Sequence, residues 1–333
     1  ENRPAHLTFD PRRPDMDQFL DRPTHQIAKG RSIHGLAAED SIGSARNCSS
    51  CHDATQSHEW LPYHSRHFSA LACETCHIPK LYGPALKAID WTMLDASGEP
   101  IRQYRGVEGG EIGPETELEG VQPVVLPRHN GGETYNLAPI NAVASWFWLT
   151  GEPPRPVSRD ELRNALLVDE GHHPDLVTGL DQDGDGQLTG DELQLRTAEQ
   201  QLIVRQRLAD AGLSPLTVVT ELTPFSINHN VVTSTAIREC TTCHNKNSLL
   251  NTEFPLSSYM PGGQAPSSEG YASVQYSGNL MVTEGGGVSG VPDVSQDGFY
   301  IIGLDAIDLI DRLGLLLLIM TILGVAGHGS LRY

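Results

Sequence analysis

Six cysteines are spaced so that they could attach haem covalently. The chain contains 6 Cys, and all of them fall in three copies of the pattern Cys-x-x-Cys-His. In this pattern two thiols add to the two vinyl groups of one haem, and the histidine binds the iron from one side. The pattern therefore predicts three covalent haem c groups. The residues that hold them are Cys48, Cys51, His52, Cys73, Cys76, His77, Cys240, Cys243 and His244.

Two other uses of paired cysteines explain the pattern less well. Zinc ribbons and redox-active disulfides both contain Cys-x-x-Cys. Neither use requires a histidine directly after the second cysteine, and this chain has one there all three times, as His52, His77 and His244. Haem attachment accounts for every cysteine and for these three histidines.

The sixth position on each iron decides what the haem can do. A second imidazole makes an electron carrier, whereas an open position allows a substrate to bind. The chain has 14 His, and each motif is preceded by at least one. We therefore expect three bis-histidine haems, with the pairing of ligands and irons left open. The predicted distal ligands are His34, His64, His67 and His229. The further candidates for this role, each of which is otherwise a solvated loop histidine, are His58, His129, His172 and His173.

The spacing of the motifs constrains the fold. The first two motifs are close in sequence, so their haems should be neighbours. The third motif begins only at Cys240. The fold must bring it back to the other two if the haems are to exchange electrons.

A twelve-residue acidic loop, 181–192, fits the EF-hand pattern. Carboxylates stand at its positions 1, 3 and 5, glycine at 6 and glutamate at 12. Position 7 would donate its backbone carbonyl and position 12 would bind bidentately. The pattern predicts a structural Ca²⁺ site and not a sensor, because sensors pair their hands. The predicted ligands are Asp181, Asp183, Asp185, Gln187 and Glu192.

The C-terminal region is apolar from Leu313 to Ala326, and the stretch extends to Leu331. Such a length approaches the thickness of a bilayer core, so it predicts one transmembrane helix, with a buried core helix as the alternative. Arg332 weakly indicates a cytoplasmic C-terminus. His328 would be an interfacial histidine, or would lie near a b-type haem of a membrane partner.

Composition completes the expected fold. Gly 33 and Pro 22 are numerous and aromatic residues are 6%, so we expect a mainly α and irregular, haem-packed multihaem cytochrome c, with an EF-hand-like insertion and a C-terminal transmembrane helix. The aromatic run at 142–149 should pack in the core or against haem. A net charge of -19 excludes nucleic-acid binding and suits either solubility or docking to a basic partner.

Changes in composition along the chain predict five regions. The N-terminal dihaem region covers 1–157, and the helical, EF-hand-like calcium-binding insertion covers 158–212. The third-haem region covers 213–265, a linker covers 266–300, and the transmembrane anchor covers 301–333.

Several short stretches resemble the octahaem tetrathionate reductase-like family. The resemblance spans parts of 30–265, and it implies bis-histidine haem packing with His52, His77 and His244 as proximal ligands. That family has eight haems and a lysine-ligated catalytic iron, and this chain lacks a Cys-x-x-Cys-Lys motif, so the reductase activity is not implied. A short C-terminal stretch, 327–332, is similar to helices tied to cytochrome b. The stretches that carry the family resemblance are Ala72–Lys80, Asp90-Trp91, Glu239–Asn245, Phe254–Leu256 and Pro261–Gly263.

Together these features predict a membrane-anchored electron-transfer subunit, more plausibly non-catalytic than an enzyme. It would relay electrons between a membrane redox subunit, such as a quinone-linked cytochrome b, and another redox protein. Haem c attachment takes place outside the cytoplasm, so we expect the periplasm or the outer face of the membrane, with a leader removed before Glu1. The alternatives are a reductase of a sulfur or nitrogen oxyanion at one open haem, and a protomer of an extracellular cytochrome filament.

Overall fold

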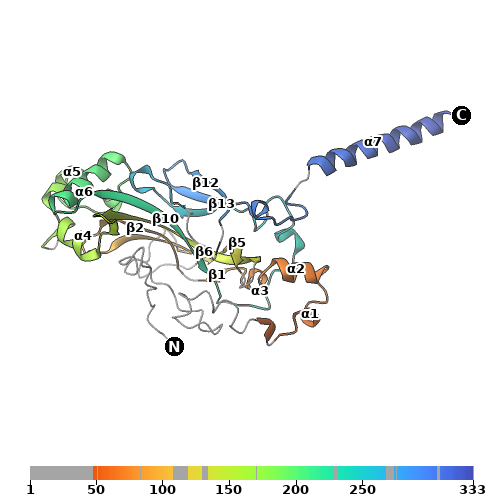
Figure 1. Ribbon diagram of the computed structural model, residues 1–333, viewed down its shortest axis with the longest axis horizontal. Coiled ribbons are helices and arrows are strands. Elements are labelled where there is room, and N and C mark those ends of the chain that lie inside the picture. The colour runs from red at the N-terminus through yellow and green to blue at the C-terminus, as the bar shows by residue number, and fades with distance from the viewer. Residues whose placement is uncertain are drawn as a thin grey trace.

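A six-stranded sheet forms the centre of the molecule (Figure 1). Its strand order is β10-β6-β2-β3, and β5 and β7 also pair with β6. The computed structural model describes residues 48–50, 52–82, 84–107, 119–129, 134–169, 171–228, 231–267, 274, 276–305 and 308–332. The strands of the sheet are β2 (Ala85–Leu94), β3 (Pro100–Arg105), β5 (Val124–His129), β6 (Tyr135–Thr150), β7 (Arg155–Pro156) and β10 (Leu216–Ser226).

The long strand β6 organises this sheet. It pairs antiparallel with β10 from Leu216↔Thr150 to Ser226↔Ile140, antiparallel with β5, and parallel with β2. Strands β2 and β3 form an antiparallel pair. The sheet therefore joins segments of the chain that lie far apart in sequence.

Both faces of β6 are buried, which explains its almost continuous apolar sequence. On one face, Val143 and Phe147 pack with the helices α4 (Arg159–Leu166), α5 (Pro174–Leu180) and α6 (Ala198–Asp210). On the other face, Ala144 and Trp146 pack with a three-stranded sheet. The aromatic run at 142–149 thus packs in the protein core, which is one of the two roles predicted for it.

The prediction of a mainly α and irregular fold is wrong, because two β-sheets provide most of the core. Haem motifs and abundant glycine suggested loops and short helices. The strands carry β-branched and aromatic residues whose periodicity is hidden, since strands that are buried on both faces do not alternate. Helices are present, but in the described residues they cover the sheet and do not replace it.

The second sheet comes from the range predicted as a linker. Its strands are β11 (Phe254–Ser257), β12 (Gly278–Val282) and β13 (Val288–Pro292), in the order β11-β13-β12. In the described part of 266–300, the chain therefore forms strands and a 3₁₀ helix, η10 (Val294–Asp297). Glycine and serine there serve turns and close packing: a Cβ on Gly290 would lie 2.5 Å from the Phe254 ring.

The range 158–212 contains the helices α4, α5 and α6 and the acidic loop. Helix α4 begins with a capping box between Ser158 and Glu161. Helix α5 leads into the acidic loop, but only a 3₁₀ turn, η7 (Gly190–Leu193), follows it. The next helix, α6, begins only at Ala198, with its own capping box from Thr197 and Gln200.

Short elements complete the described chain. Helices α1–α3 lie at the opposite end of the central sheet from α4–α6 (Figure 1). The short elements are η5 (Cys48–Ser50), α1 (Ala54–Ser57), α2 (His64–Ala70), α3 (Cys73–His77), β1 (Leu81–Tyr82), β4 (Gly120–Val121), β8 (Leu167–Val168), β9 (Gly171–His172), η8 (Cys240–Thr242) and η9 (Pro261–Gly263).

The C-terminal helix α7 (Asp308–Ser330) projects away from the rest of the molecule (Figure 1). Its segment Arg312–Ser330 is 19 residues long with a mean hydropathy of 1.9 and is 0% buried. By length and composition it is able to span a membrane. Its exposure does not fit the alternative of a buried core helix.

A buried polar network connects the two sheets. The Asp90 carboxylate on β2 accepts hydrogen bonds from the Thr92 hydroxyl at 2.6 Å and the Tyr259 hydroxyl at 2.8 Å. Burial raises the pKa of Asp90 to about 6, although these hydrogen bonds oppose the shift. The network fixes Tyr259, which follows β11, against the central sheet.

We expect this carboxyl group to make stability depend on pH. Its pKa is raised from 3.8 to about 6, so the folded chain binds more protons between these values than the unfolded chain does. Stability should therefore fall as pH rises through this window, by up to about 3 kcal/mol. Asp90→Asn keeps a similar shape and should flatten this part of the profile. Urea unfolding of both chains between pH 4.5 and 7 tests this, and equal slopes would assign the effect to another group.

Candidate functional site

The second Cys-x-x-Cys-His motif forms helix α3 and is fastened to the start of β6. The Leu137 carbonyl accepts hydrogen bonds from the Ala72 amide at 2.9 Å and from the Thr75 hydroxyl at 2.7 Å. Just before it in β6, the Asn136 side chain donates to the Ser69 carbonyl at 3.0 Å. The rigid central strand thus positions both α2 and α3.

The two residues between the cysteines of this motif are buried. Glu74 is 6% exposed and Thr75 is 2% exposed. The Glu74 carboxylate lies 3.6 Å from the Arg128 guanidinium on β5. The motif therefore turns its polar middle toward the β5–β6 hairpin.

The fold returns the third motif to the second, as electron exchange would require. Just before the third motif, the Ile237 amide donates to the Cys76 carbonyl at 2.9 Å, and the Val232 amide donates to the His77 carbonyl at 2.8 Å. The Cys76 thiol is near enough to Cys243 to contribute, after burial, to raising the pKa of Cys243 to about 11.

The first motif lies beside Cys73, the first cysteine of the second motif. The thiols of Cys48 and Cys73 are within hydrogen-bonding reach, and burial together with this neighbour raises the pKa of Cys73 to about 11. His52 is exposed. Cys51 lies outside the described residues. The second motif therefore stands between the first and the third.

Two pairs of imidazoles lie close together at this end of the molecule. The ring centres of His58 and His77 are 5.8 Å apart with an interplanar angle of 87°. Those of His67 and His244 are 6.0 Å apart at 76°. Each pair joins one motif histidine with one histidine from the segment between the first two motifs.

Each of these four imidazoles lies within hydrogen-bonding distance of a backbone carbonyl through Nδ1. The acceptors are the carbonyls of Ala54 for His58, Tyr63 for His67, Val232 for His77 and Ile302 for His244, at 2.8, 3.3, 2.7 and 2.8 Å respectively. A carbonyl oxygen can only accept, so Nδ1 must carry the hydrogen. The lone pair of Nε2 is then available to a metal, an arrangement usual for histidine ligands.

The ring separations fit one metal ion between each pair. A metal lies about 2.0–2.1 Å from a ligating imidazole nitrogen, and the ring centre lies roughly 1.1 Å further away, so opposed imidazoles are about 6 Å apart between centres. Both measured separations agree with this value. Since each pair includes the histidine of a haem-attachment motif, the residues fit a haem with two axial histidines.

The predicted distal ligands fare differently. His67 is one of the paired imidazoles, whereas His64 packs its ring against Phe68. His58, which the sequence offered only as an alternative ligand, is the imidazole that lies beside His77. His34 and His229 lie outside the described residues. Spacing alone does not separate three histidines in one segment, because the choice depends on how α1 and α2 fold.

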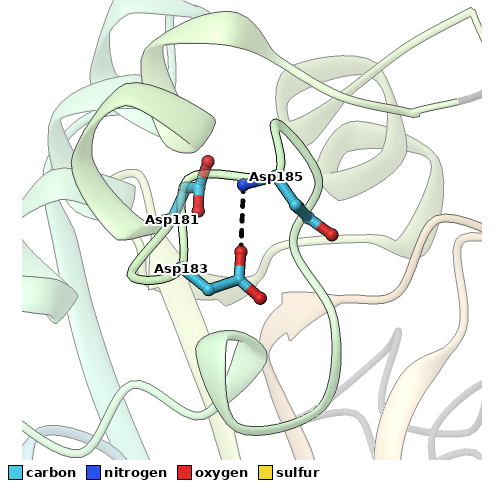
Figure 2. Close-up of side chains that lie close together, drawn as sticks. All are labelled: Asp181, Asp183 and Asp185. Carbon is cyan, nitrogen blue, oxygen red and sulfur yellow. Dashed lines mark hydrogen bonds between the residues drawn. The ribbon is translucent and has the colours of Figure 1, made fainter.

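The acidic loop gathers three of its predicted ligands (Figure 2). Asp181, Asp183 and Asp185 each offer a carboxylate oxygen within 4.8 Å of the others. Calcium–oxygen distances of about 2.3–2.6 Å would allow such oxygens to share one ion. The Asp185 amide donates to the Asp183 carboxylate at 3.0 Å. Hydrogen bonds from the Gly184 and Gly186 amides lower the pKa of Asp181, so this carboxylate stays ionised.

The other two predicted ligands, Glu192 and Gln187, are placed differently from the three aspartates. Glu192 accepts hydrogen bonds from the amides of Gln182 at 2.7 Å and Thr189 at 3.1 Å, which closes the loop. Gln187 is exposed. The loop lies with α4–α6, at the opposite end of the central sheet from α1–α3 (Figure 1).

No family model matches the chain, and no curated protein matches it. Among solved structures, a crystal structure of octaheme cytochrome c from Shewanella oneidensis is similar, with a TM-score of 0.35 and 14% sequence identity. The match covers 72% of this chain and 58% of that chain. At this TM-score the likeness is distant and does not establish a shared fold.

The hydrogen bond from Thr75 to β6 should stabilise the second motif. Thr75→Val keeps the side-chain shape but removes the hydroxyl, so it should lower the free energy of unfolding by about 1 kcal/mol. Thr75→Ser keeps the hydroxyl and serves as the control. Urea unfolding of the haem-loaded chains measures both values, and a Thr75→Val chain as stable as the wild type would show that this bond contributes nothing.

Proposed function

We propose that this chain is a trihaem c-type cytochrome that relays electrons and takes no part in substrate chemistry. The segment before the third motif is hydrogen-bonded to the second, and His58, which follows the first motif, lies beside His77 of the second. The observation that carries the proposal is the close pair of imidazoles at two of these motifs, with ring centres 5.8 and 6.0 Å apart and Nδ1 of each ring near a backbone carbonyl. Bound haem supplies the redox chemistry, because its iron changes between ferric and ferrous states.

The described residues support electron transfer through the ligands of the iron and through the carbonyls that hold these ligands. Two imidazoles on each iron would occupy both axial positions, so neither would be left for a substrate. The carbonyls of Ala54, Tyr63, Val232 and Ile302 hold these imidazoles in orientation and raise their basicity. Greater basicity favours the ferric state and so lowers the reduction potential. For the first haem, His34, His64 and His229 remain candidate distal ligands.

The same proposal places the chain on the outer face of the cytoplasmic membrane. Helix α7 would insert in the lipid bilayer, because 19 residues of mean hydropathy 1.9 are fully exposed in it. The partners would be a membrane redox subunit, such as a cytochrome b, and a second redox protein outside the cytoplasm. The net charge of -19 suits a partner with a basic docking face.

The imidazole pairs make a specific prediction about spin state. His58→Ala should leave the second haem with one axial ligand, and His67→Ala should do the same to the third. Each variant should therefore contain one high-spin ferric haem per chain. Optical and EPR spectra of the oxidised proteins, with haem c quantified per chain after denaturation, measure this.

His173→Ala is the control, because His173 caps helix α5, which lies at the opposite end of the central sheet from α1–α3 (Figure 1). The second and third haems should remain low-spin in this variant. The pairing is overturned if His58→Ala and His67→Ala stay fully low-spin. A high-spin haem in the wild-type chain would favour the oxyanion-reductase alternative, and fewer than three haems would contradict the trihaem proposal.

We also propose that the loop 181–192 binds Ca²⁺ as a structural clamp. Support comes from the three clustered aspartates and the EF-hand spacing. A bound ion would hold the exit of α5 against the turn η7. Because these elements pack with the helices that cover the central sheet, the ion would stabilise the fold at the end away from the haems.

Calcium removal should therefore lower the melting temperature without changing the haem spectra. Ion binding to the folded state adds about 2.7 kcal/mol to the free energy of unfolding when the free ion is at a hundred times its Kd. Asp181→Ala, which removes the carboxylate at position 1 of the loop, should abolish the difference between calcium and chelator. Asp191→Asn, at an exposed non-ligand position of the same loop, should preserve it. Calorimetry with both variants checks this, and an unchanged melting temperature of the wild type in chelator would refute the calcium site.

A further inference from the structure

We propose that the third haem is the one next to the membrane, and that the second and then the first follow it outward. The inference rests on the proposed function, because it requires haems at the three motifs and α7 in a bilayer. It adds the direction of the chain of haems and identifies the place where a membrane partner exchanges electrons.

The turn that leads toward α7 is closed by its own hydrogen bonds. The amides of Leu304 and Asp305 donate to the Ile301 carbonyl at 3.1 and 2.9 Å, and the Ile301 amide donates to the Asp305 carboxylate at 2.6 Å. Ile301 is buried in a cluster with Leu249 and Leu250, which follow the third motif. The turn is therefore fixed to the third-haem region.

This turn also holds the iron ligand of the third motif. The Ile302 carbonyl accepts the Nδ1–H of His244 at 2.8 Å. Gly303 has φ +91°, and a Cβ built there would lie 2.8 Å from the His244 carbonyl oxygen. Glycine is thus needed both for the backbone conformation and for the close approach. The orientation of His244 depends on residues that immediately precede α7.

The chain length places the membrane near this ligand, whatever the direction of α7. From Ile302 to the start of α7 at Asp308, a fully extended backbone reaches no further than about 22 Å. The apolar segment begins at Arg312, within the first turns of the helix. Tyr300 and Ile302 are 57% and 70% exposed, so apolar surface on this turn is available to a lipid headgroup region.

The contacts between motifs give the order of the remaining haems. Ile237, just before the third motif, donates its amide hydrogen to the Cys76 carbonyl of the second at 2.9 Å. His58, which closely follows the first motif, has its ring centre 5.8 Å from that of His77 in the second. The second motif is therefore the middle one, and the first is furthest along the row from the turn that precedes α7. An electron entering from the membrane would pass from the third haem to the first.

A pair of glycine variants tests the link between the turn and the third haem. Gly303→Ala should shift the EPR signal and the midpoint potential of the third haem and leave the other two unchanged, because the added Cβ presses on His244. Gly298→Ala is the matched control, since Gly298 has φ +83° with no atom within 4 Å of its added Cβ. A shift of the same size in both variants, or none in Gly303→Ala, would overturn the link.

A second experiment measures the distance of each haem from the lipid. The full chain is reconstituted in phosphatidylcholine–phosphatidylglycerol vesicles that carry a gadolinium chelate on some headgroups. Relaxation enhancement of each ferric haem signal then reports its proximity to the membrane surface. The third-haem signal is identified by its loss in the double variant Cys240→Ala/Cys243→Ala, and the first by its loss in Cys48→Ala/Cys51→Ala.

We expect the enhancement to decrease from the third haem to the second and then to the first. The proposal is overturned if the first haem relaxes fastest, if all three respond equally, or if the haem-loaded chain fails to float with the vesicles. Failure of the proposed function is a distinct result, because the wild-type chain would then lack covalent haem or contain a high-spin iron before any vesicle is added.

Discussion

A hydrogen bond from Nδ1 of histidine to a backbone carbonyl recurs at each opposed imidazole, and the site depends on it. It fixes the tautomer, because the carbonyl can only accept, and it leaves the lone pair on Nε2. The carbonyls of Ala54 and Tyr63 are local, since each lies four residues before its histidine. Those of Val232 and Ile302 lie 155 and 58 residues from His77 and His244, so these two bonds require that the rest of the fold bring distant segments together.

The central strand β6 meets much of this requirement. Its start accepts hydrogen bonds from the second motif through Leu137. Its far end packs, through Phe147, against the helices that carry the acidic loop. Burial on both faces makes the strand a rigid support, and the loss of apolar contacts would oppose any movement of it. One element therefore sets the position of the haem-binding end and of the helical end.

The segment between the first two motifs has a second role in this arrangement. His58 and His67 both come from it, yet they face the histidines of different motifs. A single short segment would thus tie the second and third haems together. The third is also tied to the turn before α7 through His244. The ligands that would set the redox properties of the haems are in this way part of the framework that sets their order.

The sequence by itself identified the three Cys-x-x-Cys-His motifs, the acidic loop and the apolar C-terminal segment, because each depends on residues that are close in the chain. It did not determine the sheets, since strands buried on both faces lack alternation and resemble other apolar runs. Nor did it distinguish His58 from His64, which are similarly placed in sequence. Only the tertiary structure decided that pairing, because the partner of each imidazole is the histidine of a motif that folding brings within about 6 Å of it.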